Sequence, residues 1–296
     1  MTLLAPRPAG ARPTSPAAAP PTVQVINTGL TMAALIALWL VVQLTVLGSI
    51  SHDRAQTLLY RDLRVDLSQQ TAPLGGPIEP GTPVALLTLP TIGVEEVVVE
   101  GTNSGDLRAG PGHRRGTPLP GQVGTSVVYG RAATYGGPFR ELPRLAVGDP
   151  IVAVSAQGTQ TFSVIGLRRE GDPLPQPAAA GVARLTLVTA EGSGPFARFT
   201  PTETVFVDAE AAEGFGTPSA PTAALPPEAE QAMGTDPEAL PALALCLALL
   251  LALTLGVVAV RQRLSAVLTW VIASPLVIAL AWITTDTAAR LLPNLV

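Results

Sequence analysis

The sequence contains no lysine, one cysteine and two histidines. Cys246 alone excludes a disulfide within the chain and a metal site built from several thiolates. His52 and His113 lie far apart in the sequence and leave little material for a histidine-rich metal site. The sequence has no phosphate-binding loop and no basic stretch, and its formal net charge is -4. We therefore expect no cofactor, no metal and no nucleic-acid partner.

Aromatic residues are scarce, at 4% of the chain, whereas 47% of the residues are hydrophobic. Most of these concentrate in three apolar runs, 29–50, 240–260 and 264–283, which are long enough to cross a hydrocarbon core of about 30 Å as helices. Gln43 is the one strongly polar residue of the first run. We interpret this run as a retained anchor, because it is long and lacks a small-residue cleavage site. Pro275 predicts a kink in the third run.

The arginines predict how the three runs are oriented. The short loop between the second and third runs carries Arg261 and Arg263, and the positive-inside rule assigns such a loop to the cytoplasm. With three spans, the N-terminus lies on the same side as that loop. The sequence thus predicts a plasma-membrane protein with a flexible cytoplasmic tail over 1–28 and a central region outside the cytoplasm.

The segments between and after the apolar runs are expected to form a helix, linkers and a tail. A juxtamembrane helix and linker are expected over 51–79, and the helix, over 54–68, has leucines near one face: Leu58, Leu59, Leu63 and Leu67. The Pro-, Ala- and Glu-rich stretch 211–239 predicts an exposed linker. A short tail is expected over 284–296.

The central region, 80–210, has short strand-like runs separated by Gly and Pro. These runs are VALLTLP, VEEVVVE, TSVVYG, IVAVSA, QTFSVIGL, RLTLVTA and ETVFVDA. Such a pattern predicts an all-β barrel or sandwich, with PFRELPRL as the best candidate for a helical turn. In QTFSVIGL we expect Phe162, Val164 and Ile165 to point into the core.

Several motifs of the central region follow one another in a distinctive order: LPTIGVEEVVVEGT, DLRAGPGHRRGTPLPGQVGTSVVYGR, TYGGPFREL, VGDPI and LTLVTA. In this order the region resembles the sortases, the cell-surface cysteine transpeptidases of Gram-positive bacteria, and most of all their actinobacterial, class E-like groups. The resemblance implies a mainly β fold. An eight-stranded β-barrel would lie over 80–210 on the outer side of the membrane, flanked by three transmembrane α-helices.

The resemblance also implies which positions would carry the chemistry. Sortases use a cysteine at the end of a strand as nucleophile, a histidine as acid, and an arginine that stabilises the oxyanion. Here Ala190 of LTLVTA stands at the cysteine position and Arg131 at the histidine position, whereas Arg198 is retained. A guanidinium stays protonated at neutral pH and cannot exchange a proton there. His113 matches a family position outside the active site, and we interpret it as structural.

These positions predict a non-catalytic pseudoenzyme that binds a cell-surface protein or cell-wall fragment, or holds a complex together. Its ligand groove would be formed by Arg131, Arg198, Thr189 and Glu191, with the two arginines binding a carboxylate or phosphate. In one alternative Glu191, or another local acid, pairs with Arg131 and the groove is inert; in another the barrel is a plain spacer. A third alternative is a cysteine-independent transpeptidase or hydrolase acting on cell-surface proteins, with the hydroxyl of Thr189 or Ser193 as nucleophile.

Overall fold

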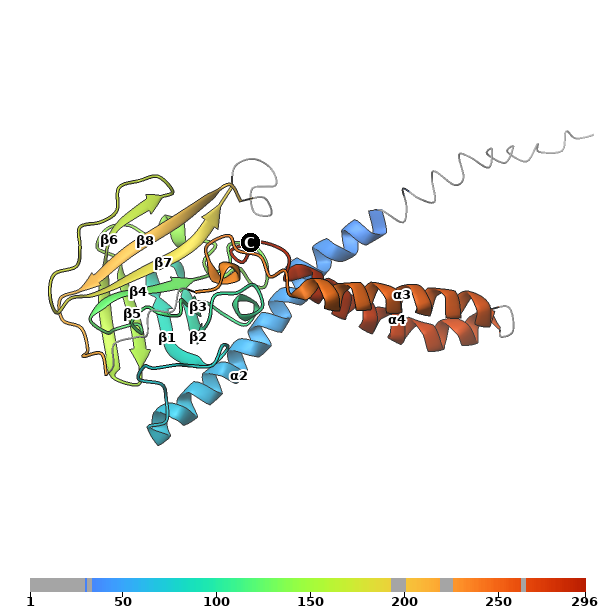
Figure 1. The fold of residues 1–296 in the computed structure, drawn as a ribbon, viewed down its shortest axis with the longest axis horizontal. Helices are drawn as coiled ribbons and strands as arrows, with labels where there is room; N and C mark the ends of the chain where they lie inside the picture. Colours follow the sequence, from blue (N-terminus) through green and yellow to red (C-terminus); the bar gives the residue numbers. More distant parts are fainter. Residues whose placement is uncertain (1–29, 31–33, 193–200, 219–225, 262–264) are drawn as a thin grey trace, which may run out of the picture. The chain divides into compact units, whose positions relative to one another are not determined.

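The structure is a computed structural model that describes residues 30, 34–192, 201–218, 226–261 and 265–296. The expected cytoplasmic tail lies outside these residues, as do Arg263 of the hairpin loop and two residues of the predicted site region, Ser193 and Arg198. Residues 41–296 form one compact unit that contains the barrel and the C-terminal helices (Figure 1).

The described part of the central region forms a closed barrel of eight strands. In chain order these are β1 (Pro83–Leu89), β2 (Val94–Glu100), β3 (Gly112–His113), β4 (Gly124–Tyr129), β5 (Pro150–Ser155), β6 (Gly158–Arg169), β7 (Ala183–Glu191) and β8 (Glu203–Ala211). Around the barrel the order is β1-β2-β3-β4-β7-β8-β6-β5, and β5 pairs with β1 to close it. The predicted eight-stranded β-barrel is thus confirmed, and the turn predicted in PFRELPRL is the short 3-10 helix Leu142–Arg144.

Two of the strand pairs are parallel, β2 with β3 and β4 with β7, and the others are antiparallel. Because parallel strands end at the same edge of a sheet, the residues that follow β4 come to lie beside the last residues of β7. This pairing places two of the sequence-predicted site positions, Arg131 and Ala190, at neighbouring strand ends.

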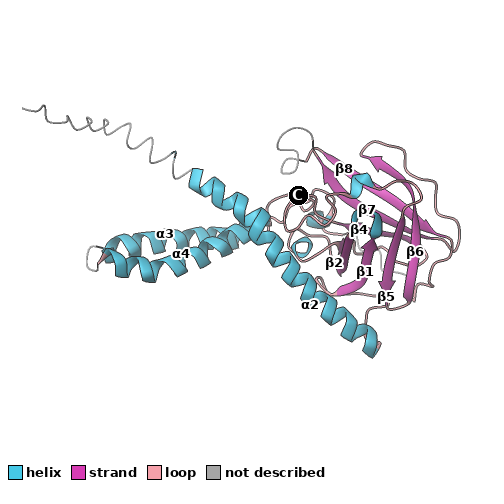
Figure 2. Cartoon of the chain, turned by 180° about the vertical axis from the view of Figure 1, so that it is seen from behind, coloured by secondary structure: helices cyan, strands magenta, loops and turns pink. Residues whose placement is uncertain are grey.

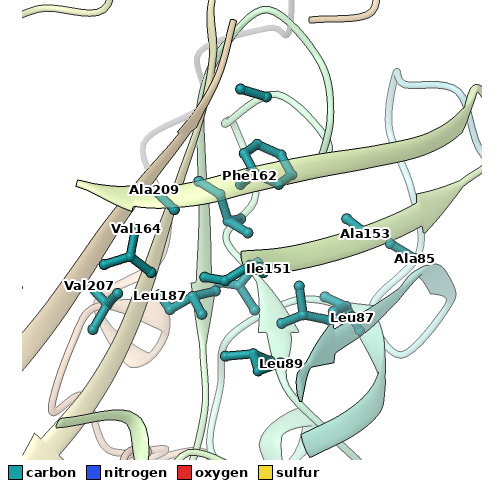
Figure 3. Packing of buried hydrophobic residues seen from close by; sticks show 14 of the residues in the cluster. Ala85, Leu87, Leu89, Ile151, Ala153, Phe162, Val164, Leu187, Val207 and Ala209 are labelled. Atoms are coloured by element: carbon teal, nitrogen blue, oxygen red, sulfur yellow. The ribbon is translucent and has the colours of Figure 1, made fainter. Parts of the chain in front are cut away.

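The barrel interior is filled by aliphatic side chains that alternate along the strands (Figure 3). Phe162 and Val164 of β6 are buried there, as predicted. Ile165, however, is 40% exposed, so its expected inward position is wrong. Successive strand residues point to opposite faces, so burial of Val164 turns Ile165 outward. The pairing of β6 with β8 shifts register between Val164 and Gly166, immediately around this residue.

Helix α2 (Gly48–Gln69) lies alongside β1 and β2 (Figures 1 and 2). A π-helical turn, Gln43–Leu47, precedes it within a helix that runs from Ala34 to Gln69. Leu63 is buried against the barrel, but Leu58 is 44% exposed, so the prediction that these two leucines share one face is wrong. A helix turns 100° per residue, which puts His52 on the same face as Leu63 and turns Leu58 away.

Two further helices, α3 (Ala239–Arg261) and α4 (Ala266–Ala289), pack against each other as the predicted hairpin. Together with Ala34–Gln69, they make three described helices long and apolar enough to cross a membrane. Pro275 lies inside α4, which continues to Ala289, beyond the predicted end of the third span at residue 283. Near its end, α4 contacts the barrel region, because Asp286 pairs with Arg108 between β2 and β3.

The predicted exposed linker and the predicted short tail both pack against the barrel. In the predicted linker 211–239, Glu230 is buried and pairs with Arg115. In the predicted tail 284–296, Asn294 and Leu295 are fully buried, and the chain returns to the barrel (Figures 1 and 2). Local composition did not reveal this, because the burial depends on contacts with residues far away in the sequence.

Candidate functional site

The candidate site lies at the adjacent ends of β4 and β7, and we call it the strand-end site: Arg131, Thr189 and Ala190. Tyr129 pairs with Val188 in the parallel register, and the amide of Gly130 continues the ladder by donating to the Val188 carbonyl at 2.9 Å. The Thr189 hydroxyl donates to the carbonyl of Gly130 at 3.0 Å. The structure thus brings together three residues that the sequence predicted as site residues.

Gly130 allows the chain to turn inward before Arg131. A Cβ atom on Gly130 would collide with the ring of Phe139, so only glycine fits this close approach. The amide of Phe139 donates to the Arg131 carbonyl at 3.1 Å, which holds the following loop against the same strand end. The position of Arg131 is therefore set by backbone packing on both sides.

Ala190 presents only a methyl group at the end of β7. The residue is 5% exposed and belongs to a hydrophobic cluster with Leu107, Tyr129, Val188 and Leu295. Neighbouring Thr189 is fully buried, and its hydroxyl is engaged with Gly130. The end of the strand is therefore an apolar surface without a thiol.

Arg131 is fully buried and its guanidinium donates to main-chain and hydroxyl oxygens. Nη2 donates to the carbonyl and the hydroxyl of Ser104 at 2.7 and 2.9 Å, and Nη1 donates to the Thr134 hydroxyl at 2.9 Å and the Val296 carbonyl at 2.8 Å. The guanidinium carbon also lies 5.2 Å from the centre of the Tyr135 ring. Burial lowers the pKa of Arg131 to about 10, so it remains charged at neutral pH.

The expected partner of Arg131 in the inert alternative was Glu191. In the structure Glu191 pairs with Arg169 instead, at 3.0 Å, and both side chains are largely exposed. Glu191 is the last residue of β7, and alternation along the strand turns it away from the face that Ala190 occupies. Of the other predicted groove residues, Arg198 lies outside the described residues.

An acidic residue of α4 reaches the edge of the site. Asp286 accepts a hydrogen bond from the Tyr135 hydroxyl at 2.9 Å and forms an ion pair with Arg108. Burial, followed by the nearby Asp286 carboxylate, raises the pKa of Tyr135 above its ordinary value. These contacts hold the end of α4 beside the loop that carries Arg131.

The residues after α4 enter the site. The Asn294 amide group donates to the carbonyls of Thr102 and Gln231 at 2.7 and 2.9 Å. The Leu295 carbonyl accepts from the amide of Ala132 at 2.9 Å, next to the bond between Arg131 and Val296. The C-terminal segment, Pro293–Val296, is thus bonded to the strand-end site through backbone and side-chain groups.

Comparison with known proteins finds a family similar to the barrel region. Residues 87–209 match the family model of the sortase domain. Sortase D of Bacillus subtilis (strain 168) is 31% identical over 87 residues, which are 29% of this chain and 42% of that relative. The matched stretch therefore spans less than half the length of this curated relative.

Solved sortase structures resemble the same region. A Sortase D5 transpeptidase of Clostridium perfringens is 20% identical, covers 55% of this chain and 99% of its own, and gives a TM-score of 0.44. The SrtA sortase of Actinomyces oris is 27% identical, covers 51% of this chain and 92% of its own, and gives a TM-score of 0.40. The closed eight-stranded barrel described above has the architecture of the sortase fold.

The two histidines, one in the barrel and one in α2, are engaged in internal contacts. His113 is buried, with Nδ1 2.7 Å from Glu100 Oε2 and Nε2 3.0 Å from the Pro118 carbonyl oxygen, which fits its structural interpretation. His52 of α2 lies 3.1 Å from Glu96. Among the described residues, no three His, Cys, Asp or Glu side chains are grouped to hold a metal ion.

Sequence reasoning missed several residues around the strand-end site: Ser104, Arg108, Tyr135, Asp286 and Pro293–Val296. One signal was available, because Asp286 is a lone carboxylate near the end of an apolar run, and ionisable groups in such runs usually have partners. The others carry no local signal. Ser104 acts through its backbone carbonyl as well as its hydroxyl, and a carbonyl is common to every residue.

Proposed function

We propose that this chain is a membrane-anchored pseudoenzyme with a sortase domain outside the cytoplasm, where it binds a cell-surface protein or cell-wall fragment, or holds a complex together. The observation that carries the proposal is the methyl group of Ala190 at the end of β7, where the resemblance implies a nucleophilic cysteine. Acyl transfer through a covalent intermediate needs a nucleophile at that place.

The second replacement supports the same conclusion. Arg131 occupies the position of the acid, and with a pKa of about 10 it holds its proton at neutral pH. It therefore cannot protonate a leaving amine and be regenerated in each cycle. In hydrolases that use a nucleophile and base together, loss of either costs on the order of a millionfold in turnover. Loss of both leaves no useful rate.

The alternative of cysteine-independent catalysis requires another nucleophile. Thr189 is the described hydroxyl next to Ala190, and it is fully buried and donates to a backbone carbonyl. No His, Lys or carboxylate among its described hydrogen-bond partners could take its proton. This environment favours the binding function over hydroxyl-based chemistry.

The predicted anionic ligand needs a specific change at the site. Arg131 is buried and already donates to Val296, so a carboxylate or phosphate would have to displace that residue to reach the guanidinium. We retain the groove of Arg131, Arg198, Thr189 and Glu191, and the class E-like subgroup, as proposals. In the proposed groove, the anion competes with the C-terminal segment for Arg131.

The deciding experiment is a turnover assay with the full chain in detergent or nanodiscs. Fluorescent sorting peptides are incubated with the protein, with and without an amine acceptor, and products are followed by mass spectrometry. We expect no cleavage and no transfer. Turnover that persists after purification and is lost on Thr189→Val would establish the hydroxyl-dependent alternative and refute the pseudoenzyme.

A further inference from the structure

The C-terminal segment occupies the strand-end site as a compact turn. The amide of Val296 donates to the Pro293 carbonyl at 3.1 Å, which closes the turn. Within it, Leu295 joins the hydrophobic cluster that contains Ala190, and the carbonyls of Leu295 and Val296 accept from Ala132 and Arg131. Apolar contact together with main-chain hydrogen bonds is how proteins commonly bind short peptides.

The hydrogen bonding of this segment is incomplete at two buried atoms. Within the described residues, Arg131 Nε and Asn294 Oδ1 have no hydrogen-bond partner. Buried polar groups that belong to a permanent core are almost always paired, so each such atom calls for an explanation. Unpaired buried atoms of this kind are expected of a binding site that exchanges its occupant.

The segment is connected to the rest of the protein in a way that allows exchange. Only Arg290–Leu292 separate it from the end of α4, and α4 is held at the barrel by Asp286. The strands of the barrel close without the segment. Withdrawal of these few residues would leave the ladder intact and free Arg131 and the amide of Ala132.

We propose that the strand-end site is a peptide-binding site, and that Asn294–Val296 of the same chain are its resident ligand. While they are bound, the site is closed to other ligands; when they withdraw, it accepts a turn-forming peptide with an asparagine followed by an aliphatic residue. This inference rests on the proposed function, because a binding role requires an accessible site. It names both the ligand class and the segment that controls access.

The first test measures binding of a fluorescent peptide, ARLLPNLV, which has the sequence of residues 289–296. Binding is measured by fluorescence anisotropy to two proteins in nanodiscs: the full chain and a variant that ends at Pro293. We expect saturable binding to the shortened chain and at least tenfold weaker binding to the full chain, whose site is occupied. A peptide with aspartate in place of the leucine that corresponds to Leu295 should bind at least tenfold more weakly.

Two arginine variants test whether the peptide binds at the strand-end site. In the shortened chain, Arg131→Gln should weaken peptide binding at least tenfold, whereas Arg144→Gln, a change of an exposed arginine, should leave it unchanged. A shortened chain that melts cooperatively but does not bind the peptide would overturn the proposal. Equal binding by the Arg131→Gln variant would do the same.

The second test avoids truncation, which could unfold the domain. Hydrogen exchange is measured in the full chain at two neighbouring amides: Ala132, which donates to Leu295, and Gly130, which donates to Val188 within the barrel. If the segment opens locally, Ala132 exchanges at least tenfold faster than Gly130. Equal rates, limited by global unfolding for both amides, would show a permanent core segment and sink the proposal.

The outcome for this inference is separable from that for the proposed function. The peptide from the binding assay is analysed by mass spectrometry after incubation. Binding without cleavage supports both, and binding followed by cleavage supports the peptide site but refutes the pseudoenzyme. Absence of binding to a folded, shortened chain refutes the peptide site alone.

Discussion

Arg131 and Val296 lie 165 positions apart in the chain and are joined by a hydrogen bond of 2.8 Å between Nη1 and the carbonyl oxygen. The bond links the loop after β4 to the residues after α4. It also uses an arginine that stands where the sortase resemblance implies a histidine. The same arginine is thus a contact between the loop after β4 and the C-terminal segment.

Replacement of that arginine tests its energetic role. Arg131→Gln removes the donor to the buried carbonyl of Ser104, whereas the Val296 oxygen keeps its bond from the Thr134 hydroxyl, and an unsatisfied buried group costs about 1–3 kcal/mol. We expect a clear fall in melting temperature. The exposed variant Arg144→Gln should change stability by less than about 0.5 kcal/mol. Equal melting of the two variants would show that Arg131 contributes no more than a surface arginine.

Restoring the nucleophile tests the chemistry. In a Cys246→Ser background, the Ala190→Cys thiol should alkylate slowly, because the position is 5% exposed. Arg131 can lower the thiol pKa through its charge but cannot donate a proton to a leaving amine. Acyl transfer should therefore need Arg131→His as well, which mass spectrometry of the acyl-enzyme would detect. Transfer by Ala190→Cys alone would contradict this assignment of roles.

The half-buried carboxylate of Asp106 predicts a dependence of stability on pH. Burial, then the nearby Glu230 carboxylate, raises the pKa of Asp106 from 3.8 to about 6. The folded state therefore holds the proton more tightly than the unfolded state, and this contribution favours folding below pH 4 and is lost as the pH rises through 6. Asp106→Asn should gain stability relative to the parent at pH 7.

The measurement is denaturant unfolding of both proteins between pH 4 and 8. The advantage of Asp106→Asn should shrink towards pH 4, where the parent carboxyl is protonated. An asparagine can still accept through its side-chain oxygen the bond that Asn103 now donates to Asp106 at 2.6 Å. Asp62→Asn, a change on the exposed side of α2, serves as the control. A pH-independent difference would contradict the prediction.

The ion pair between Arg108 and Asp286 should couple α4 to the barrel. A double-mutant cycle with Arg108→Gln and Asp286→Asn measures the coupling by thermal unfolding in detergent. Groups that share one network commonly couple by about 0.5–3 kcal/mol. The exposed pair of Arg144 and Glu141 provides a matched cycle, expected near the lower values typical of surface pairs. Equal coupling energies in the two cycles would show that the pair of Arg108 and Asp286 contributes no more than an ordinary surface ion pair.

The orientation in the membrane can be tested with fusion reporters. A reporter inserted after residue 220 should be active only outside the cytoplasm, because Arg261 and Arg263 predict a cytoplasmic hairpin loop. A second reporter beside Arg261 should be active only inside. A cytoplasmic signal from the first fusion would overturn the predicted three-span orientation.

The sequence was informative about the barrel because strand patterns are local. Apolar alternation predicted β6 and the inward positions of Phe162 and Val164. The prediction for Ile165 departed from strict alternation, whereas the structure follows it and turns Ile165 outward, beside the register shift of β6 against β8. The prediction for Leu58 was also wrong, because the packed face of α2 includes the polar His52, which pairs with Glu96.

The site was predictable only in part. Motif order placed Ala190 and Arg131 at corresponding positions, and the parallel pairing of β4 and β7 brings them to neighbouring strand ends. The partners of Arg131 were not predictable, because Ser104 and Val296 bond through backbone carbonyls, which have no sequence signature. The buried Asn294 could not be inferred from a short stretch that follows a membrane helix.

The closeness of α4 to the strand-end site limits which partners can reach it. With α3 and α4 in a bilayer, Asp286 and the Tyr135 loop lie at the membrane-facing end of the barrel. A ligand tethered to the same membrane would search a surface rather than a volume, and tethering raises its effective concentration at the site. A freely diffusing peptide gains no such advantage. The architecture therefore favours membrane-bound partners even where the intrinsic affinity of the site is modest.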